Sequence, residues 1–199
     1  MASSTKYAAG SDETGVRVNG NKHWAWTWQN DEATFITISY NRAQRSIEQT
    51  FKNGFKDAVL VHDCWASHFN TPAISHQVCV AHLLRDLNYL NELHGHKWSM
   101  ATKLVFQLAL SLKSQMNKVD YYIENKRRLQ LEKRLDFLIS MELPEDKKEL
   151  VRFQKRLRKY RQYLFVFLYR QEVPYNKNSI EMLLDLFALQ NTLHKKRPS

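Results

Sequence analysis

Residues 58–69 read AVLVHDCWASHF, and this stretch decides how the rest of the chain is interpreted. Residues 58–61 form a short apolar run after the turn-forming Asn53-Gly54 pair, a pattern typical of a strand buried on both faces. Asp63 comes where that strand ends, and open α/β sheets place their chemistry at the carboxyl ends of central strands. An aspartate after a strand can equally be a turn former or a helix cap. The stretch alone leaves both roles open for Asp63.

The chain is basic and shows no membrane or export segment. Its 199 residues include 30 Lys and Arg against 20 Asp and Glu, a formal net charge of +10 at pH 7. This excess favours a polyanionic partner, because basic side chains that bind phosphates release counterions. No run approaches about 20 apolar residues, and the first residues lack the order of a signal peptide. We therefore expect a cytoplasmic protein without a membrane partner.

The two cysteines, Cys64 and Cys79, lie in apolar runs, which indicates a reducing compartment. Cys79 and His82 have a spacing that zinc sites use. A structural zinc needs four ligands, however, and no second Cys/His pair with suitable spacing stands nearby. A buried cysteine that leads into a helix is the other interpretation.

Turn residues divide the N-terminal region into short strands. Polar breaks at 19–21 and 29–32 separate three expected strands: residues 14–18, 23–28 and 34–39. The tryptophans at 24, 26 and 28 alternate with smaller residues, so their rings fall on one face. That face is either part of the core or a platform for stacking bases.

The next elements extend this meander. An amphipathic helix is expected over 42–52, then the strand before Asp63, a short helix near Pro72, a strand over 77–81 and a helix with a leucine stripe. Three antiparallel strands followed by alternating helices and strands indicate a ribonuclease-H-like α/β fold, in which parallel strands extend the meander.

Residues 96–172 differ from the preceding region in composition and periodicity. They form long periodic segments rich in Leu, Lys, Arg, Glu and Gln. We interpret them as an all-α insertion of two or three long helices, over 98–116, 119–141 and 145–171. The expected organisation is a tail or scar at 1–10, the core at 11–95, the insertion at 96–172 and a return to the core at 173–199. The insertion carries basic residues that form either a solvated helix face or a phosphate-binding surface: Lys126, Arg127, Arg128, Lys155, Arg156, Arg158 and Lys159.

Two other carboxylates could join Asp63. Asp12 lies beside the first expected strand, which neighbours the fourth strand in this fold, so Asp12 and Asp63 can converge. Glu181 lies on a late helix, where Asn178 and Glu181 also fit a capping box. Two or three carboxylates suffice to hold magnesium, and two such ions can serve an in-line phosphoryl transfer.

Four blocks carry a resemblance to a known family: DETGVRVNG at 12–20 with His23-Trp24 after it, VLVHD at 59–63, CVAHLLRDL at 79–87 and VPYNKNSIE at 173–181. In this order they resemble the catalytic domain of transposases of the insertion-sequence-66 family. The resemblance implies a ribonuclease-H-like domain with a D-D-E triad at Asp12, Asp63 and Glu181. It also implies site-supporting positions at His82, Arg85 and Asn178.

The same resemblance implies cofactors and partners. It implies two Mg²⁺ or Mn²⁺ ions, and cleavage and strand transfer on double-stranded DNA at transposon ends and target. A bacterial, nucleoid-associated location, a homo-oligomer in the active state and other transposition proteins as partners are expected with it.

The sequence departs from the family pattern at both ends. No DNA-binding segment precedes Asp12, so we expect a truncated catalytic-domain fragment. Glu181 is followed by Met182 where the family has Arg, and we expect the resemblance to end there, as a frame change near codon 182 would cause. Two rival interpretations follow: a catalytically inactive remnant that only binds nucleic acid, and a stand-alone nuclease that hydrolyses DNA without joining it.

Overall fold

The computed structural model describes residues 7–174, which belong to two compact units. The sheet unit runs to His76 and the helical unit begins at Gln77. This boundary lies well before the expected one at residue 96. The reason is that helix α3 (Val80–His94) packs on helix α4 (Lys97–Gln115), so it belongs with the helices that follow.

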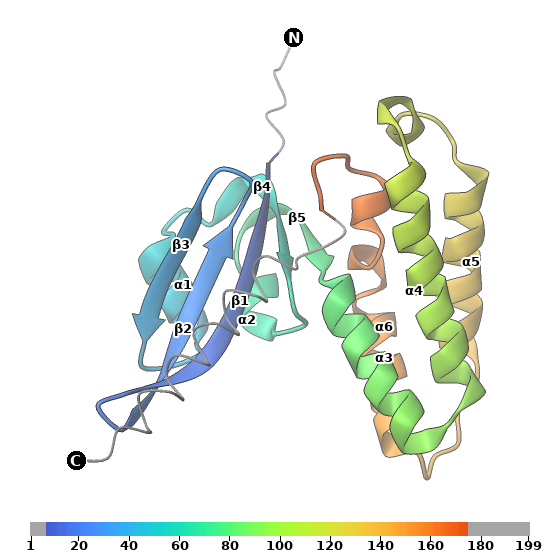
Figure 1. Ribbon diagram of the computed structural model, residues 1–199, viewed down its shortest axis with the longest axis horizontal. Coiled ribbons are helices and arrows are strands. Elements are labelled where there is room, and N and C mark those ends of the chain that lie inside the picture. The colour runs from blue at the N-terminus through green and yellow to red at the C-terminus, as the bar shows by residue number, and fades with distance from the viewer. Residues whose placement is uncertain (1–6, 175–199) are drawn as a thin grey trace, which may run out of the picture. The chain divides into compact units, whose positions relative to one another are not determined.

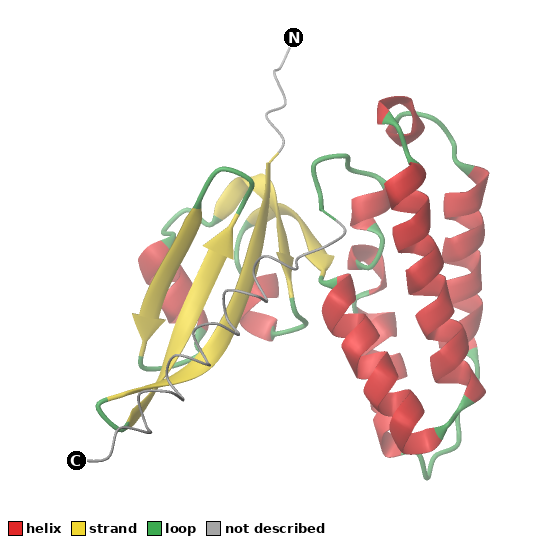
Figure 2. Ribbon diagram, in the orientation of Figure 1, coloured by secondary structure: helices red, strands yellow, loops and turns green. Residues whose placement is uncertain are grey.

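A five-stranded mixed sheet forms the first unit, in the order β3-β2-β1-β4-β5 (Figures 1 and 2). Strand β1 pairs antiparallel with β2 and parallel with β4, while β2 pairs antiparallel with β3. This confirms the predicted α/β class with a meander extended by a parallel strand. The strands are β1 (Tyr7–Val18), β2 (Asn21–Gln29), β3 (Thr34–Ser39), β4 (Phe55–His62) and β5 (Ala73–Val78).

Two strand boundaries differ from the sequence expectation. Strand β1 begins at Tyr7, inside the expected tail, because residues 7–10 pair with residues 58–61 of β4. Strand β5 begins at Ala73, four residues before the expected 77.

Gly54, with φ of +62°, makes the turn into β4, and a Cβ there would lie 2.5 Å from the carbonyl oxygen of Pro72. Only glycine fits that turn.

Aromatic side chains fill the core on one face of the sheet. Trp26, Trp28 and Ile47 are buried together, and Ile47 comes from helix α1 (Gln44–Thr50), which is shorter than the expected helix over 42–52. Trp24 is only partly buried at the edge of this cluster. The alternating tryptophans therefore serve as core residues, because Trp26 and Trp28 have no free face for a base.

The helical unit contains α3, α4, α5 (Lys126–Ser140) and α6 (Lys148–Lys159), with short 3-10 turns η1 (Lys118–Tyr121), η2 (Arg161–Tyr163) and η3 (Val166–Leu168). The expected helix over 145–171 stops at Lys159. Phe165 and Phe167 are both buried, yet they would lie about 200° apart on a continuous helix. Irregular turns allow both rings to reach the interior.

Buried polar groups hold this irregular segment in place. The Gln77 side-chain amide donates to the carbonyl oxygen of Leu164 at 3.1 Å, and its oxygen accepts the Phe167 N–H at 2.9 Å. The Lys113 ammonium donates to the carbonyl oxygens of Phe167 and Arg170 at 2.8 and 2.9 Å. Among residues 7–174, no helix combines the length and the apolar composition that crossing a membrane requires.

Candidate functional site

The strand register brings Asp12 and Asp63 to the same level of the sheet. Gly10 of β1 is opposite Val61 of β4 in the parallel pair, and each aspartate follows two residues further along. Asp63 directly follows the end of β4, as expected. Two carboxylates distant in sequence therefore lie on neighbouring central strands.

Asp63 is held by two hydrogen bonds and remains partly exposed. Its Oδ1 accepts the backbone N–H of Trp65 at 2.9 Å, which is the turn-forming role that the sequence left open. Its Oδ2 accepts from Nη2 of Arg42 at 3.0 Å. The side chain keeps 24% of its surface exposed, so Asp63 combines a local turn with a reachable carboxylate.

Asp12 lies in the middle of β1 and is 9% exposed. Its Oδ1 accepts the backbone N–H of Glu13 at 2.9 Å. Because successive side chains of a strand point to opposite faces, Asp12 and Glu13 leave β1 on different sides of the sheet. Strand β1 thus carries a carboxylate on each face, and it is Glu13 that shares the Arg42 guanidinium with Asp63.

Glu13 is a buried third carboxylate that the sequence reasoning missed. Its side chain is fully buried, accepts from Arg42, and lies 3.1 Å from Nε2 of His68. Burial raises the pKa of Glu13 to about 7, helped by the negative charges of Asp63 and Asp12 and opposed by Arg42. The shift therefore reflects mainly the loss of water around this buried carboxylate. The only signal for Glu13 in the sequence was its place in the DETG block.

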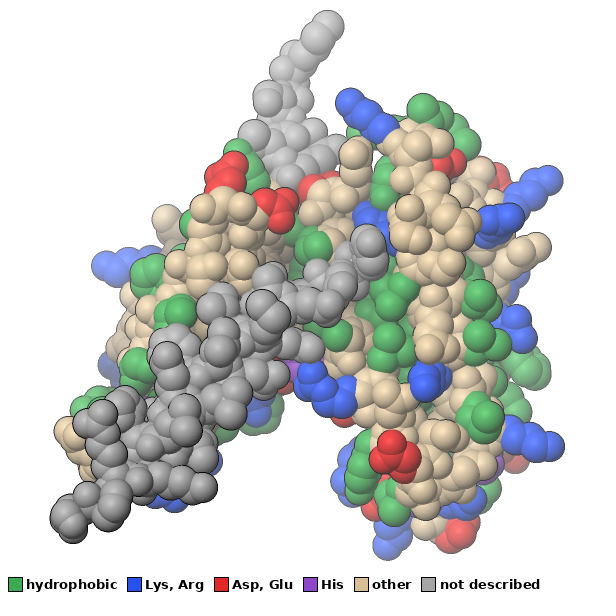
Figure 3. All heavy atoms as spheres, in the orientation of Figure 1, with side chains coloured by type: hydrophobic (Ala, Val, Ile, Leu, Met, Phe, Trp, Pro, Cys, Tyr) green, Lys and Arg blue, Asp and Glu red, His purple; other side chains and the backbone are tan. Residues whose placement is uncertain are grey.

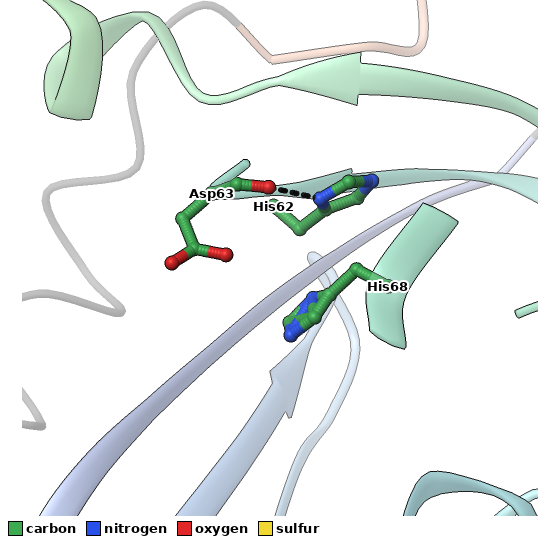
Figure 4. A group of neighbouring side chains, drawn as sticks. All are labelled: His62, Asp63 and His68. Carbon is green, nitrogen blue, oxygen red and sulfur yellow. Dashed lines mark hydrogen bonds between the residues drawn. The ribbon is translucent and has the colours of Figure 1, made fainter. Parts of the chain in front are cut away.

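Histidines surround the Asp63 end of β4. His62 Nε2 lies 3.0 Å from Nδ1 of His76, and burial lowers the pKa of His76. His68 comes from the short helix α2 (Ala66–Phe69) and stacks on Trp26 with ring centroids 5.7 Å apart. In Figure 4 the His62 ring turns back to the Asp63 carbonyl oxygen, while the Asp63 carboxyl group points away from that ring.

His62, Asp63 and His68 each offer a ligand atom within 4.8 Å of the others, so they could hold a metal ion (Figure 4). The two imidazoles favour a transition metal such as zinc, iron or nickel, whereas the carboxylate of Asp63 also suits magnesium or manganese. His68 is also paired with Glu13. Asp63 is the member that this group shares with the carboxylate pair.

The remaining expected site residues do not belong to the described part of the sheet unit. His82 is half-buried and Arg85 exposed, and both lie on α3 in the helical unit. Their supporting roles stay predictions. Asn178 and Glu181 lie outside the described residues, and so does the proposed third carboxylate position of the triad.

The expected basic surface divides into exposed and internal side chains. Arg128 is buried, donates to the carbonyl oxygens of Leu168 and Ile123 at 3.1 Å, and covers the Tyr169 ring. Arg156 pairs with Asp86. The exposed members lie on α5 and α6: Lys126, Arg127, Lys155, Arg158 and Lys159. Figure 3 shows Lys and Arg side chains projecting from several places on the visible face of the helices.

The mixed sheet with carboxylates on neighbouring central strands is consistent with the ribonuclease-H-like class of α/β proteins. The model of the family described as transposase IS66 family matches residues 3–193. The chain therefore belongs to the IS66 transposase family, whose members are associated with DNA transposition. The match continues beyond Glu181, where the sequence resemblance was expected to end. No curated protein and no solved structure matches the chain.

Proposed function

We propose that this chain carries the catalytic site of a DDE-type transposase, which cleaves DNA at insertion-sequence ends and joins it to target DNA. The observation that carries this proposal is the shared level of Asp12 and Asp63 on the parallel strands β1 and β4. Glu181 would be the third member of the triad, by the family resemblance. Family membership supports a DNA-directed activity.

The donors at this site fit a hard divalent cation. Asp12 and Asp63 offer carboxylate oxygens, and their negative charges add to the effect of burial in raising the pKa of Glu13. Magnesium and manganese prefer such oxygen ligands. Asp12, Asp63 and Glu181 would hold two metal ions in our proposal. When bound, these ions would supply charge stabilisation for the attacking and leaving oxygens of a phosphodiester.

The chain's own residues prepare the two carboxylates. The Trp65 N–H and the Arg42 guanidinium each hold one oxygen of Asp63, and the Glu13 N–H holds one oxygen of Asp12. Ligands held in advance lose less freedom when a substrate or cation binds. No covalent protein intermediate is needed, because water and then a freed 3′ hydroxyl of DNA serve as nucleophiles.

The exposed basic residues of α5 and α6 would contact the DNA backbone. Lys155 and Lys159 lie four residues apart on α6, and the whole chain has a formal net charge of +10. Such contacts neutralise phosphates without reading the base sequence. Arg128 and Arg158 are left out of this surface, because their guanidinium groups donate to partners inside the helical unit.

One observation favours the second candidate, an inactive remnant that only binds nucleic acid. Both oxygens of Asp63 already have protein partners, Trp65 and Arg42. A site that satisfies its own charges is stable without a cation and without catalysis. The two candidates make different predictions for cleavage.

A cleavage assay on a supercoiled plasmid that carries element ends tests the proposal. Wild-type protein is expected to nick the plasmid only with Mg²⁺ or Mn²⁺, and Asp63→Asn to reduce nicking roughly a hundredfold or more. Asp57→Asn is the matched control, since Asp57 is an exposed residue of the same strand. Wild-type activity in Asp63→Asn would reject the assignment.

Binding without any metal-dependent nicking would favour the remnant. Supplying precut ends separates the transposase from a nuclease of the same fold, because only a transposase joins the 3′ ends to target DNA. Products that are hydrolysed but never joined would reject strand transfer.

A further inference from the structure

Arg42 brings one positive charge to two carboxylates of the site. It lies between β3 and α1, donates to Glu13, and donates through Nη2 to Oδ2 of Asp63 at 3.0 Å. The planar guanidinium has several donors in a fork, so one side chain can serve two carboxylates at once. Glu13 also has a second partner in His68, whereas Arg42 is the cationic partner of Asp63.

Other contacts hold Arg42 independently of Asp63. Its guanidinium lies 4.1 Å from the centroid of the Trp65 ring and 5.3 Å from that of Trp24. The Trp65 indole N–H donates to the Arg42 carbonyl oxygen at 3.1 Å. Cation–π contacts favour a cation at this place. The positive charge is therefore fixed beside Asp63 by the surrounding fold.

We infer that Arg42 is a positioning residue that acts as a built-in counter-cation of Asp63 and competes with the divalent cation for that carboxylate. This inference rests on the proposed function, which assigns the cation to Asp63. A fixed positive charge beside a carboxylate lowers the affinity of that carboxylate for another cation. The same ion pair keeps the Asp63 oxygens in one orientation before the cation binds.

The inference sets the direction of an effect on metal affinity. Removing the charge of Arg42 takes away a repulsion between guanidinium and metal ion, so the ion binds more tightly. A residue that only supported the structure would have the opposite effect, because its loss would disorder Asp63 and weaken the site. Metal affinity, measured without DNA, therefore separates the two roles.

The experiment is titration of Mn²⁺ into the purified chain by isothermal calorimetry. Arg42→Gln is expected to lower the Kd for Mn²⁺ roughly tenfold. Arg42→Met, whose apolar side chain can still contact the Trp65 ring, is expected to do the same. Arg42→Lys keeps a positive charge near Asp63 and is expected to change the Kd less than either neutral variant does. Arg45→Gln removes an exposed arginine of α1 and is the matched control, with an unchanged Kd.

The outcomes separate this inference from the proposed function. If wild type binds Mn²⁺ and Asp63→Asn weakens binding, a Kd that is unchanged or raised in both neutral Arg42 variants overturns the counter-cation role alone. If wild type binds no Mn²⁺, or Asp63→Asn leaves the Kd unchanged, the proposed function and the inference are both overturned. Circular dichroism establishes that each variant is folded. Because two neutral variants are measured, the test still works if one of them does not fold.

Discussion

Replacing Glu13 by Gln is expected to change how the stability of the sheet unit depends on pH. The pKa of Glu13 rises from its ordinary value of 4.5 to about 7, and its side chain is fully buried. Each unit of difference between folded and unfolded pKa corresponds to about 1.4 kcal/mol. The two values therefore correspond to about 3 kcal/mol of unfolding free energy.

The sign follows from which form the fold favours. A raised carboxyl pKa means that the folded chain favours the uncharged acid, so the contribution is fully present below pH 4.5 and is lost as the pH rises through about 7. Glutamine stays uncharged throughout. Relative to Glu13→Gln, wild type should therefore lose about 3 kcal/mol of unfolding free energy between pH 4.5 and 8.

Urea denaturation followed by tryptophan fluorescence measures this difference in metal-free buffer. Four of the five tryptophans, at 24, 26, 28 and 65, belong to the sheet unit, so the signal reports mainly on that unit. Glu32→Gln, at an exposed turn position, is the control. A plot of its unfolding free energy against pH should run parallel to that of wild type. Curves for wild type and Glu13→Gln that also run parallel from pH 4.5 to 8 would refute the reasoning.

Two other predictions concern the helical unit. Gln77→Leu should lower its unfolding free energy by about 2 kcal/mol, because the Leu164 carbonyl oxygen and the Phe167 N–H lose their buried partner; an unchanged urea midpoint by far-UV circular dichroism would contradict this. Lys155→Gln should reduce the slope of log K for DNA against log salt by about 1, while Lys118→Gln, exposed on η1, should leave it unchanged. Equal slopes for both variants would contradict the proposal that α6 contacts DNA.

Local patterns in the sequence predicted much of the fold. Alternation over residues 23–28 predicted a strand with one aromatic face, and the buried rings of Trp26 and Trp28 confirm it. The apolar run before Asp63 predicted a central strand, and β4 lies between β1 and β5. These predictions succeed because strand periodicity and burial depend on neighbours in the sequence.

Boundaries were less predictable, because partners distant in sequence decide them. Residues 7–10 contain no strong strand pattern, yet β4 supplies their hydrogen bonds and extends β1 to Tyr7. The sequence stays rich in leucine and arginine beyond Lys159. Helix α6 nevertheless ends at Lys159, because Phe165 and Phe167 must both be buried. Tertiary packing overrides local propensity at both places.

The sequence by itself determined that a carboxylate, Asp63, ends a buried strand, since this needs only an apolar run and the turn after it. The motifs also predicted Asp12 as its partner. Only the tertiary structure decided which charges surround them. Arg42, Glu13 and His68 come from a loop, a strand and a helix, and no spacing along the chain relates them. They meet because the register of β1 on β4 and the packing of α2 bring their side chains to one place.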